Sequence, residues 1–162
     1  MIIYTMRHGE AEPYKADDKS RVLTAFGESQ AKNAGKWIAK QQQKAKQVSS
    51  IEVALVSPYV RTQQTLEHLS AHVDIQTSIT SDLITPMGKV QEVHDFIDGL
   101  LLQQPQLQSL LLVTHMPLVS LLSDHMCSGF NGRIFDTADI LMMAYEPHTS
   151  AGTLSAYYQS KP

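Results

Sequence analysis

The chain has 162 residues, a hydrophobic fraction of 43% and a formal net charge of −3 from 13 Lys and Arg against 16 Asp and Glu. This length favours a single domain over residues 1–162, and the composition excludes an intrinsically disordered chain. The negative net charge argues against non-specific binding of nucleic acid or of a membrane surface. The only arginines are Arg7, Arg21, Arg61 and Arg133, so the positions of these few residues are informative.

The cysteine content and the chain start bear on the compartment. The single cysteine, Cys127, permits no internal disulfide, which fits a reducing environment. The first residues, MIIYTMRHGE, do not resemble a secretory signal, and no apolar run approaches the ~20 residues of a membrane span. These features predict a soluble cytoplasmic protein without membrane contact. The sequence contains no obvious coiled-coil repeat or apolar stripe, so we expect a monomer.

Short apolar runs alternate with amphipathic segments along the chain. The runs predict strands at residues 2–6, 51–56, 73–77 and 109–114, and two closing strands, expected to be antiparallel, at 140–145 and 153–158. Helical spacing predicts helices at about 24–46, 58–71, 89–103 and 117–127, with Thr24 and Ser57 as N-caps and Pro58 in a first turn. Residues 13–20 are polar and predict a loop. The alternation favours an α/β fold, a three-layer sandwich in which helices cover both faces of a mostly parallel sheet.

Polar side chains follow three of the predicted strands, in the sets Arg7-His8-Gly9, Ser57-Pro58-Tyr59-Val60-Arg61 and His115-Met116-Pro117. Because the carboxyl ends of parallel strands meet at one edge of a sheet, we expect two guanidiniums and two imidazoles at one rim. The planar fork of arginine binds two phosphoryl oxygens at once, and a neutral imidazole is a competent nucleophile. The sequence therefore predicts phosphoryl transfer. No acidic metal-binding cluster accompanies the set, so we expect no metal and no other cofactor.

The order and spacing of these motifs resemble those of the histidine phosphatase superfamily, also called phosphoglycerate mutase-like. Arg7-His8-Gly9 matches its RHG signature, and the other matching segments are Leu23-Thr24-x-x-Gly27-x-x-Gln30-Ala31, Ser57-Pro58-x-x-Arg61-x-x-x-Thr65 and Thr114-His115. The resemblance covers nearly the whole chain. The short length, together with Arg21-x-Leu23-Thr24 and Val113-Thr-His-Met-Pro-Leu-Val119, is most similar to the SixA-type phosphohistidine phosphatases.

The resemblance implies a role for each matching residue. His8 is the nucleophile and becomes transiently phosphorylated, while Arg7, Arg61 and His115 bind the phosphoryl oxygens. Arg21 adds to the anion site, and an acidic residue that matches Asp18 lies near it. Asp17 is adjacent, so the choice between the two carboxylates stays open. Gly9 and Ser57 complete the expected phosphate-binding set, with Gly9 permitting a close backbone approach.

Relatives that hydrolyse phosphate esters carry an acid between the second and third motifs, which protonates the leaving alkoxide. In the comparable stretch, residues 81–88, the only acid is Asp82. An imidazole, with a pKa of about 6.5, leaves without a strong acid, whereas an alcohol does not. The chain is also too short for a substantial cap over the site. We therefore expect a phosphohistidine on a partner protein as substrate, by resemblance a histidine-containing phosphotransfer domain or a carrier protein.

Two alternatives remain open at this point. The first is a phosphatase for small phosphate esters with Asp82 as the acid, and the second is a phosphoryl-binding module without turnover. The remaining candidates have plainer interpretations. His68 and His72 have the i, i+4 spacing of metal ligands, but no third ligand is evident. We expect Cys127 to be a small buried hydrophobe and Arg133 a surface charge, and we assign exposed or structural positions to His94, His125 and His148.

Overall fold

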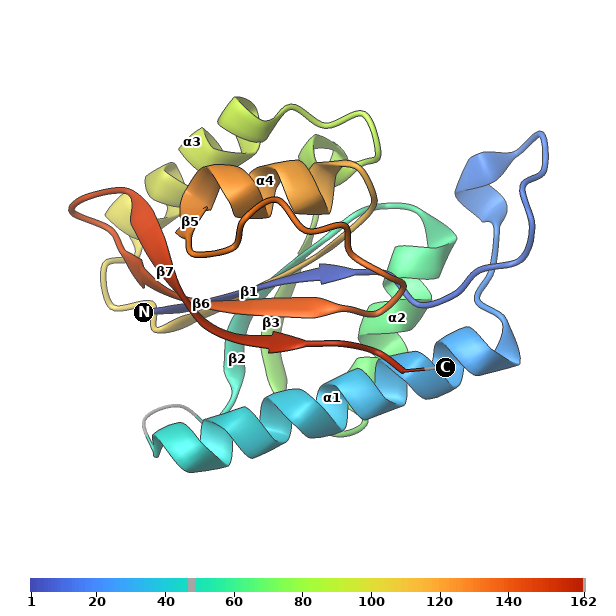
Figure 1. Cartoon of the computed structure of the whole chain (residues 1–162), viewed down its shortest axis with the longest axis horizontal. Helices are drawn as coiled ribbons and strands as arrows, with labels where there is room; N and C mark the ends of the chain where they lie inside the picture. The colour runs from blue at the N-terminus through green and yellow to red at the C-terminus, as the bar shows by residue number, and fades with distance from the viewer. Residues whose placement is uncertain (47–48, 162) are drawn as a thin grey trace.

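The computed structural model describes residues 1–46 and 49–161 and has a central sheet between two layers of helices (Figure 1). The strands are β1 (Ile2–Arg7), β2 (Ile51–Val56), β3 (Ile75–Thr80), β4 (Ser109–Thr114), β5 (Cys127–Ser128), β6 (Ile140–Glu146) and β7 (Ala151–Tyr158). The α-helices are α1 (Ala25–Ala45), α2 (Val60–Ser70), α3 (Val90–Gln103) and α4 (Leu118–Met126), and the two short 3-10 helices are η1 (Asp18–Ser20) and η2 (Asp82–Ile84). No described helix is long and apolar enough to cross a membrane.

The described strands form one sheet in the order β3-β2-β4-β1-β6-β7-β5. Strands β1 to β4 are parallel, whereas β6 runs antiparallel to β1, and β7 antiparallel to β6. The predicted α/β sandwich is thus confirmed, with its antiparallel pairs confined to the side of the sheet that holds the two closing strands. Because β1, β2 and β4 are parallel neighbours, the polar segments that follow them emerge at the same edge.

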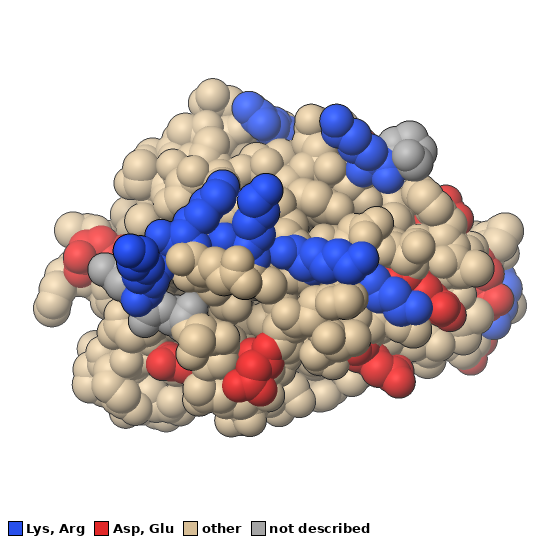
Figure 2. Space-filling view, turned by 90° about the horizontal axis from the view of Figure 1, so that it is seen from below, with Lys and Arg blue, Asp and Glu red and all other residues tan. Residues whose placement is uncertain are grey.

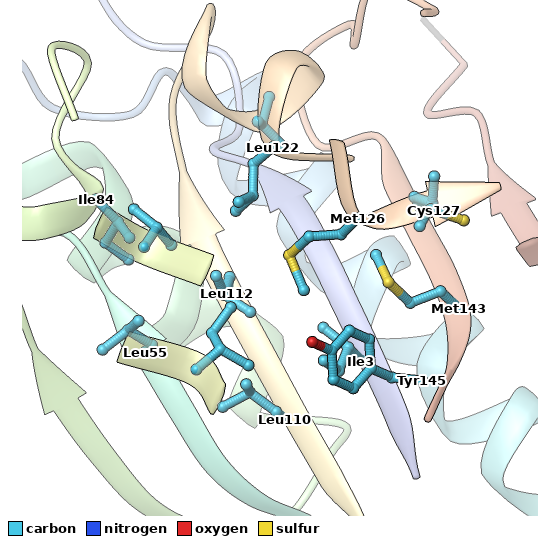
Figure 3. Packing of buried hydrophobic residues seen from close by; sticks show 14 of the residues in the cluster. Ile3, Leu55, Ile84, Leu110, Leu112, Leu122, Met126, Cys127, Met143 and Tyr145 are labelled. Atoms are coloured by element: carbon cyan, nitrogen blue, oxygen red, sulfur yellow. The ribbon is translucent and has the colours of Figure 1, made fainter. Parts of the chain in front are cut away.

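The core is divided by the sheet into two clusters, because alternate residues of each buried strand point to opposite faces. In β4, Leu110 and Leu112 face the cluster beneath α3 and α4, while Leu111 and Val113 face the cluster beneath α1 and α2. Figure 3 shows the first of these clusters, where strand side chains meet Leu122 of α4. Burial of each such side chain contributes roughly 1.5–3 kcal/mol, so both helical layers hold the sheet rim in a fixed shape.

Several predicted boundaries agree with the structure and others differ. The strands at 51–56 and 109–114 are confirmed at both ends, and Thr24 caps α1 by accepting a hydrogen bond from the Gly27 N–H at 3.0 Å. The strand predicted at 73–77 instead spans Ile75–Thr80. It lies at the sheet edge, where its register is set by pairing of Ile75 with Ile51 rather than by a strong apolar pattern. The loop predicted at 13–20 contains η1.

The prediction that Ser57 caps a helix with Pro58 in its first turn is wrong. Helix α2 begins at Val60, and the extended Tyr59 occupies the N-cap position. The Ser57 hydroxyl instead lies 2.7 Å from Nε2 of His115, which follows another strand. The physical reason is a tertiary hydrogen bond that replaces the local capping bond.

Candidate active site

The segments after β1, β2 and β4 are held together by backbone hydrogen bonds that continue past the strand ends. The His8 N–H donates to the Thr114 carbonyl at 3.0 Å, and the Ser57 N–H donates to the Val113 carbonyl at 3.2 Å. The expected rim therefore exists. It brings His8 and His115 together with their ring centroids 5.2 Å apart.

His8 is buried, and its hydrogen bonds fix its tautomer. Its Nδ1 lies 2.7 Å from the Gly9 carbonyl oxygen, and Nε of Arg61 donates to its Nε2 at 3.2 Å. A guanidinium donates only, so Nε2 carries the lone pair and Nδ1–H donates to Gly9. The ring thus presents an unprotonated Nε2 beside a positive charge, which is the form that can attack phosphorus.

Both imidazoles are neutral near pH 7. Burial lowers the pKa of His8 to about 3, with Arg61 and Arg7 adding to the effect and the Gly9 carbonyl opposing it. Burial also lowers the pKa of His115 to about 2, reinforced by His8 and then Arg61. Loss of hydration and nearby positive charge both disfavour an imidazolium, so His8 needs no base to become a nucleophile.

Arg61 and Arg21 converge on one carboxylate. Arg61 is buried at the start of α2 and donates from Nη1 to the Asp18 carbonyl at 2.7 Å and from Nη2 to Asp18 Oδ2 at 3.1 Å. Arg21 donates from Nη1 to Asp18 Oδ1 at 2.8 Å. These hydrogen bonds lower the pKa of the Asp18 carboxyl, and the bond from Arg21 has the larger effect. It is therefore Asp18, at the start of η1, that meets the arginines, and Asp17 only precedes it in the chain.

Arg7 approaches from the end of β1. Its Nη1 donates to the Phe135 carbonyl at 2.7 Å, while its buried Nε has no hydrogen-bond partner among the described residues. Burial lowers the pKa of Arg7, and the negative charges of Asp136 and Asp139 oppose that effect. A buried N–H without a partner is costly in a folded protein unless a ligand uses it, so this group suits an oxygen of a bound anion.

His115 has one ring nitrogen engaged and one not. Its Nε2 bonds with the Ser57 hydroxyl, and its buried Nδ1 has no partner in the described part of the chain. The Ser57 oxygen also accepts the Tyr59 N–H at 3.4 Å. When the Ser57 hydroxyl donates to Nε2, the ring proton is on Nδ1, which is then a donor without a partner among the described residues.

Three further residues support the site, and no site role was predicted for them. Thr65 accepts the Gly9 N–H at 3.0 Å and donates to the Arg61 carbonyl at 2.7 Å, which ties the loop after His8 to α2. The Tyr59 ring lies 4.8 Å from the His115 ring and 4.9 Å from the Arg61 guanidinium carbon. Gly27 packs so closely that a Cβ on Gly9 would lie 2.5 Å from its carbonyl oxygen. Thr65 and Gly27 belong to the sequence motifs that match the superfamily. Their contacts with Gly9 and Arg61, however, could be found only from the structure.

Other candidates lie outside this cluster. Asp82 is exposed at the start of η2, in a hollow that it shares with Met87, Lys89 and Glu92. Cys127 is buried, as expected, and Arg133 is exposed with its guanidinium over Tyr157. The described residues include no group of three His, Cys, Asp or Glu side chains that could hold a metal.

Among His94, His125 and His148, for which we expected exposed or structural positions, only His94 is buried. It is buried and bonds through Nε2 to the Tyr145 hydroxyl at 2.7 Å, which is a structural role. His125 and His148 are exposed.

A neutral imidazole bonded to the Arg61 guanidinium, with the charges of Arg7 and Arg21 also acting on it, has the chemistry of a phosphoryl-transfer site. Comparison with known proteins supports this assignment of phosphoryl-transfer chemistry. A family model described as histidine phosphatase superfamily (branch 1) matches residues 3–94. The chain belongs to this superfamily.

Relatives within the superfamily extend the match over nearly the whole chain. A Haemophilus influenzae protein named as a phosphohistidine phosphatase SixA homolog is 33% identical over 153 residues, which cover 93% of this chain and 92% of that protein. The Escherichia coli phosphohistidine phosphatase SixA is 31% identical over 141 residues, covering 86% and 83%. A structure of the protein histidine phosphatase SixA complexed with tungstate superposes with a TM-score of 0.85 at 28% identity, covering 99% of this chain and 97% of that chain.

Proposed function

We propose that this protein is a phosphohistidine phosphatase, a hydrolase that removes the phosphoryl group from a histidine on a partner protein through a phosphohistidine intermediate on His8. The observation that carries the proposal is the orientation of His8, whose Nδ1–H bonds to Gly9 while Nε2 faces Arg61. The names of the similar proteins, SixA and a SixA homolog, support the same activity. The related structure with tungstate supports an anion-binding role for the corresponding pocket.

The proposed reaction has two displacements at phosphorus. The Nε2 lone pair of His8 attacks, a new P–N bond forms, and the P–N bond of the substrate breaks. The departing imidazole keeps the electron pair and takes a proton from solvent. Water then attacks phospho-His8, releases inorganic phosphate and returns the electron pair to Nε2. Arg7, Arg21, Arg61 and His115 Nδ1 would stabilise the charge on the phosphoryl oxygens in both steps.

Asp18 would release its two arginines when a phosphoryl group enters. Its carboxylate bonds to both Arg21 and Arg61, so a dianionic ligand would compete for the same N–H groups. Gly9 and Ser57 act through His8 and His115 in this scheme, holding each ring in the tautomer that the reaction needs. All of these groups come from one chain, so we infer that a monomer suffices.

The substrate class follows from the leaving group. An exposed Asp82, bonded to none of the groups around His8 in the described structure, is poorly suited to protonating an alkoxide there. A phosphohistidine needs no such acid because imidazole is a good leaving group. We therefore infer a histidine-containing phosphotransfer domain or a carrier protein as the natural substrate, rather than a small phosphate ester.

The test is a side-by-side measurement of kcat/KM on a phosphohistidine protein and on small phosphate esters, with the wild type and Asp82→Asn. We expect far higher kcat/KM on phosphohistidine and no effect of Asp82→Asn on either substrate. Preference for esters, lost in Asp82→Asn, would instead support an ester phosphatase. Tight binding of the phosphoprotein without release of phosphate would identify a binding module.

A further inference from the structure

Helix α1 carries a gently winding row of lysines on its outer surface. Lys32, Lys36, Lys40 and Lys44 recur every four residues, and all four are exposed. The buried residues of the helix, among them Ala31 and Ile38, point the opposite way, into the sheet. Figure 2 shows positively charged side chains in a band across this face of the molecule. We call these four residues the lysine row.

Lysine is a favourable helix residue, but the electrostatics of the described structure do not account for the lysine row. Like charges at i, i+4 repel and disfavour the helix. The helix dipole favours cations only in the last turn, which accounts for Lys44 but not for the other three. The ion pairs found among the described residues all use other side chains. In a protein of net charge −3, four neighbouring cations without ion-pair partners in the described structure create a local positive field that would attract an anionic partner.

The row begins close to the candidate active site. The first turns of α1 are attached to the nucleophile loop, since Gln30 Oε1 accepts the Glu10 N–H at 2.8 Å and Gly27 packs against Gly9. Lys32 follows Gln30 by two residues. Helix geometry places successive lysines about 6 Å apart and gives the row a length of about 18 Å. The Cα–Cβ bonds of a helix tilt toward its N-terminus, so these side chains lean toward the end that holds the active site.

We propose that the lysine row is a docking surface for an acidic helix of the phosphohistidine-bearing substrate protein, an inference that rests on the proposed function. Carboxylates at i, i+4 on a helix have the same spacing as the lysines, so the two rows match in charge and in period. Docking along α1 would hold the substrate protein while its phosphohistidine reaches His8. Such docking would raise the rate at which enzyme and substrate protein associate, and it would favour phosphoproteins with an acidic helix over others.

A protein partner fits better than the other polyanions. Along the helix the row is flanked by exposed uncharged residues, such as Asn33 and Gln43, and a further exposed lysine, Lys46, lies only at its C-terminal end. Trp37, the one tryptophan of the chain, packs against Tyr158 rather than offering a free ring to a lipid surface or to bases. The reaction itself also requires a protein that presents a histidine.

The test uses two synthetic helical peptides, each joined by a flexible linker to one histidine phosphorylated with phosphoramidate. One helix carries Glu at four positions spaced by four residues, and the other carries Gln there; each is made with the linker at either end. The proteins compared are the wild type, Lys36→Gln/Lys40→Gln, and the charge-matched control Lys89→Gln/Lys161→Gln, whose lysines lie off the row.

We expect the wild type and the control to hydrolyse the Glu peptide with a kcat/KM about tenfold above that of the Gln peptide at low salt. High salt and Lys36→Gln/Lys40→Gln should remove this preference, while turnover of the Gln peptide stays equal in all three proteins. Equal turnover of both peptides by the wild type, or a preference that survives in Lys36→Gln/Lys40→Gln, would overturn the docking surface. So would row-dependent binding of duplex DNA or phosphatidylserine vesicles without a peptide preference. Failure to hydrolyse either peptide would instead contradict the proposed function.

Discussion

Arg61 donates through Nε to Nε2 of His8 at 3.2 Å, so a residue at the start of α2 contacts the proposed nucleophilic atom just beyond the end of β1. The same guanidinium bonds to Asp18 through both of its terminal nitrogens. In the proposed mechanism, Arg61 therefore orients the nucleophile and supplies positive charge at the same time. A group that does both requires the planar fork of arginine.

Arg61→Lys tests this double role. The ammonium keeps the positive charge but cannot contact His8 Nε2 and Asp18 in the same geometry. We expect kcat to fall by about 10²–10³-fold, the size of effect seen when one oriented transition-state donor is removed. Steady-state kinetics on a phosphohistidine protein measure it, with Arg133→Lys, an exposed position, as the control that retains full activity. Equal activity of the two variants would mean that charge alone suffices.

Tyr59 packs against two residues that we propose contact the substrate. Its ring lies against both His115 and Arg61. A cation–π contact of this kind contributes about 0.5–2 kcal/mol, so Tyr59→Leu should lower kcat by roughly 2–30-fold. Tyr59→Phe keeps the ring and should retain activity. A comparable loss in both variants would show that the hydroxyl, not the ring, is important.

The two buried imidazoles make the protein sensitive to acid. Their pKa values in the folded protein, about 3 for His8 and about 2 for His115, lie below the unfolded value of about 6.5. Between these values the unfolded chain binds more protons. Stability from these residues is therefore complete above about pH 6.5 and falls as the pH drops toward 3, by up to about 1.4 kcal/mol per pH unit for each imidazole.

Urea unfolding between about pH 7 and pH 5 measures this fall before most carboxylates titrate. The matched variant is His115→Asn, which keeps a polar group at the site but cannot bind the proton. Its free energy of unfolding should depend on pH less steeply than that of the wild type, by about one proton. The same slope in both proteins would contradict neutral burial of His115.

Gly27 and Gly99 offer a matched pair of helical glycines. A Cβ on Gly27 would lie 2.0 Å from the Glu10 carbonyl oxygen, while a Cβ on Gly99 would meet nothing within 4 Å. Gly27→Ala should destabilise the protein by about 1–3 kcal/mol, through overpacking, and lower activity by shifting the loop after His8. Gly99→Ala should stabilise it by about 0.5–1 kcal/mol through helix propensity. Thermal or urea unfolding of both variants checks the opposite signs.

The sequence predicted the elements whose signals are local. The buried strands Ile51–Val56 and Ser109–Thr114 have continuous apolar runs, and parallel pairing then placed His8, Arg61 and His115 at one edge. The sequence-based predictions were wrong where contacts between residues far apart in the chain determine the local structure. Ser57 has the residue type of a helix cap, yet a histidine 58 positions later takes its hydroxyl.

The choice between neighbouring carboxylates shows the same limit. Asp17 and Asp18 have equivalent chemistry in the sequence. One turn of 3-10 helix directs Asp18 toward Arg21 and Arg61, and no pattern within residues 13–20 encodes that direction. Tyr59 likewise gave no signal, because its role is defined by rings and charges from two other segments of the chain.

The most direct test of the account is to locate the phosphoryl group on the enzyme during turnover. The protein is mixed with a phosphohistidine substrate, quenched in alkali within the first turnover and examined by mass spectrometry and phosphorus NMR. A phospho-His8 intermediate would appear as acid-labile, alkali-stable phosphate on Nε2 of His8, absent in an inactive His8→Ala. Phosphate on His8 Nδ1 or on another residue, or full turnover by His8→Ala, would contradict it.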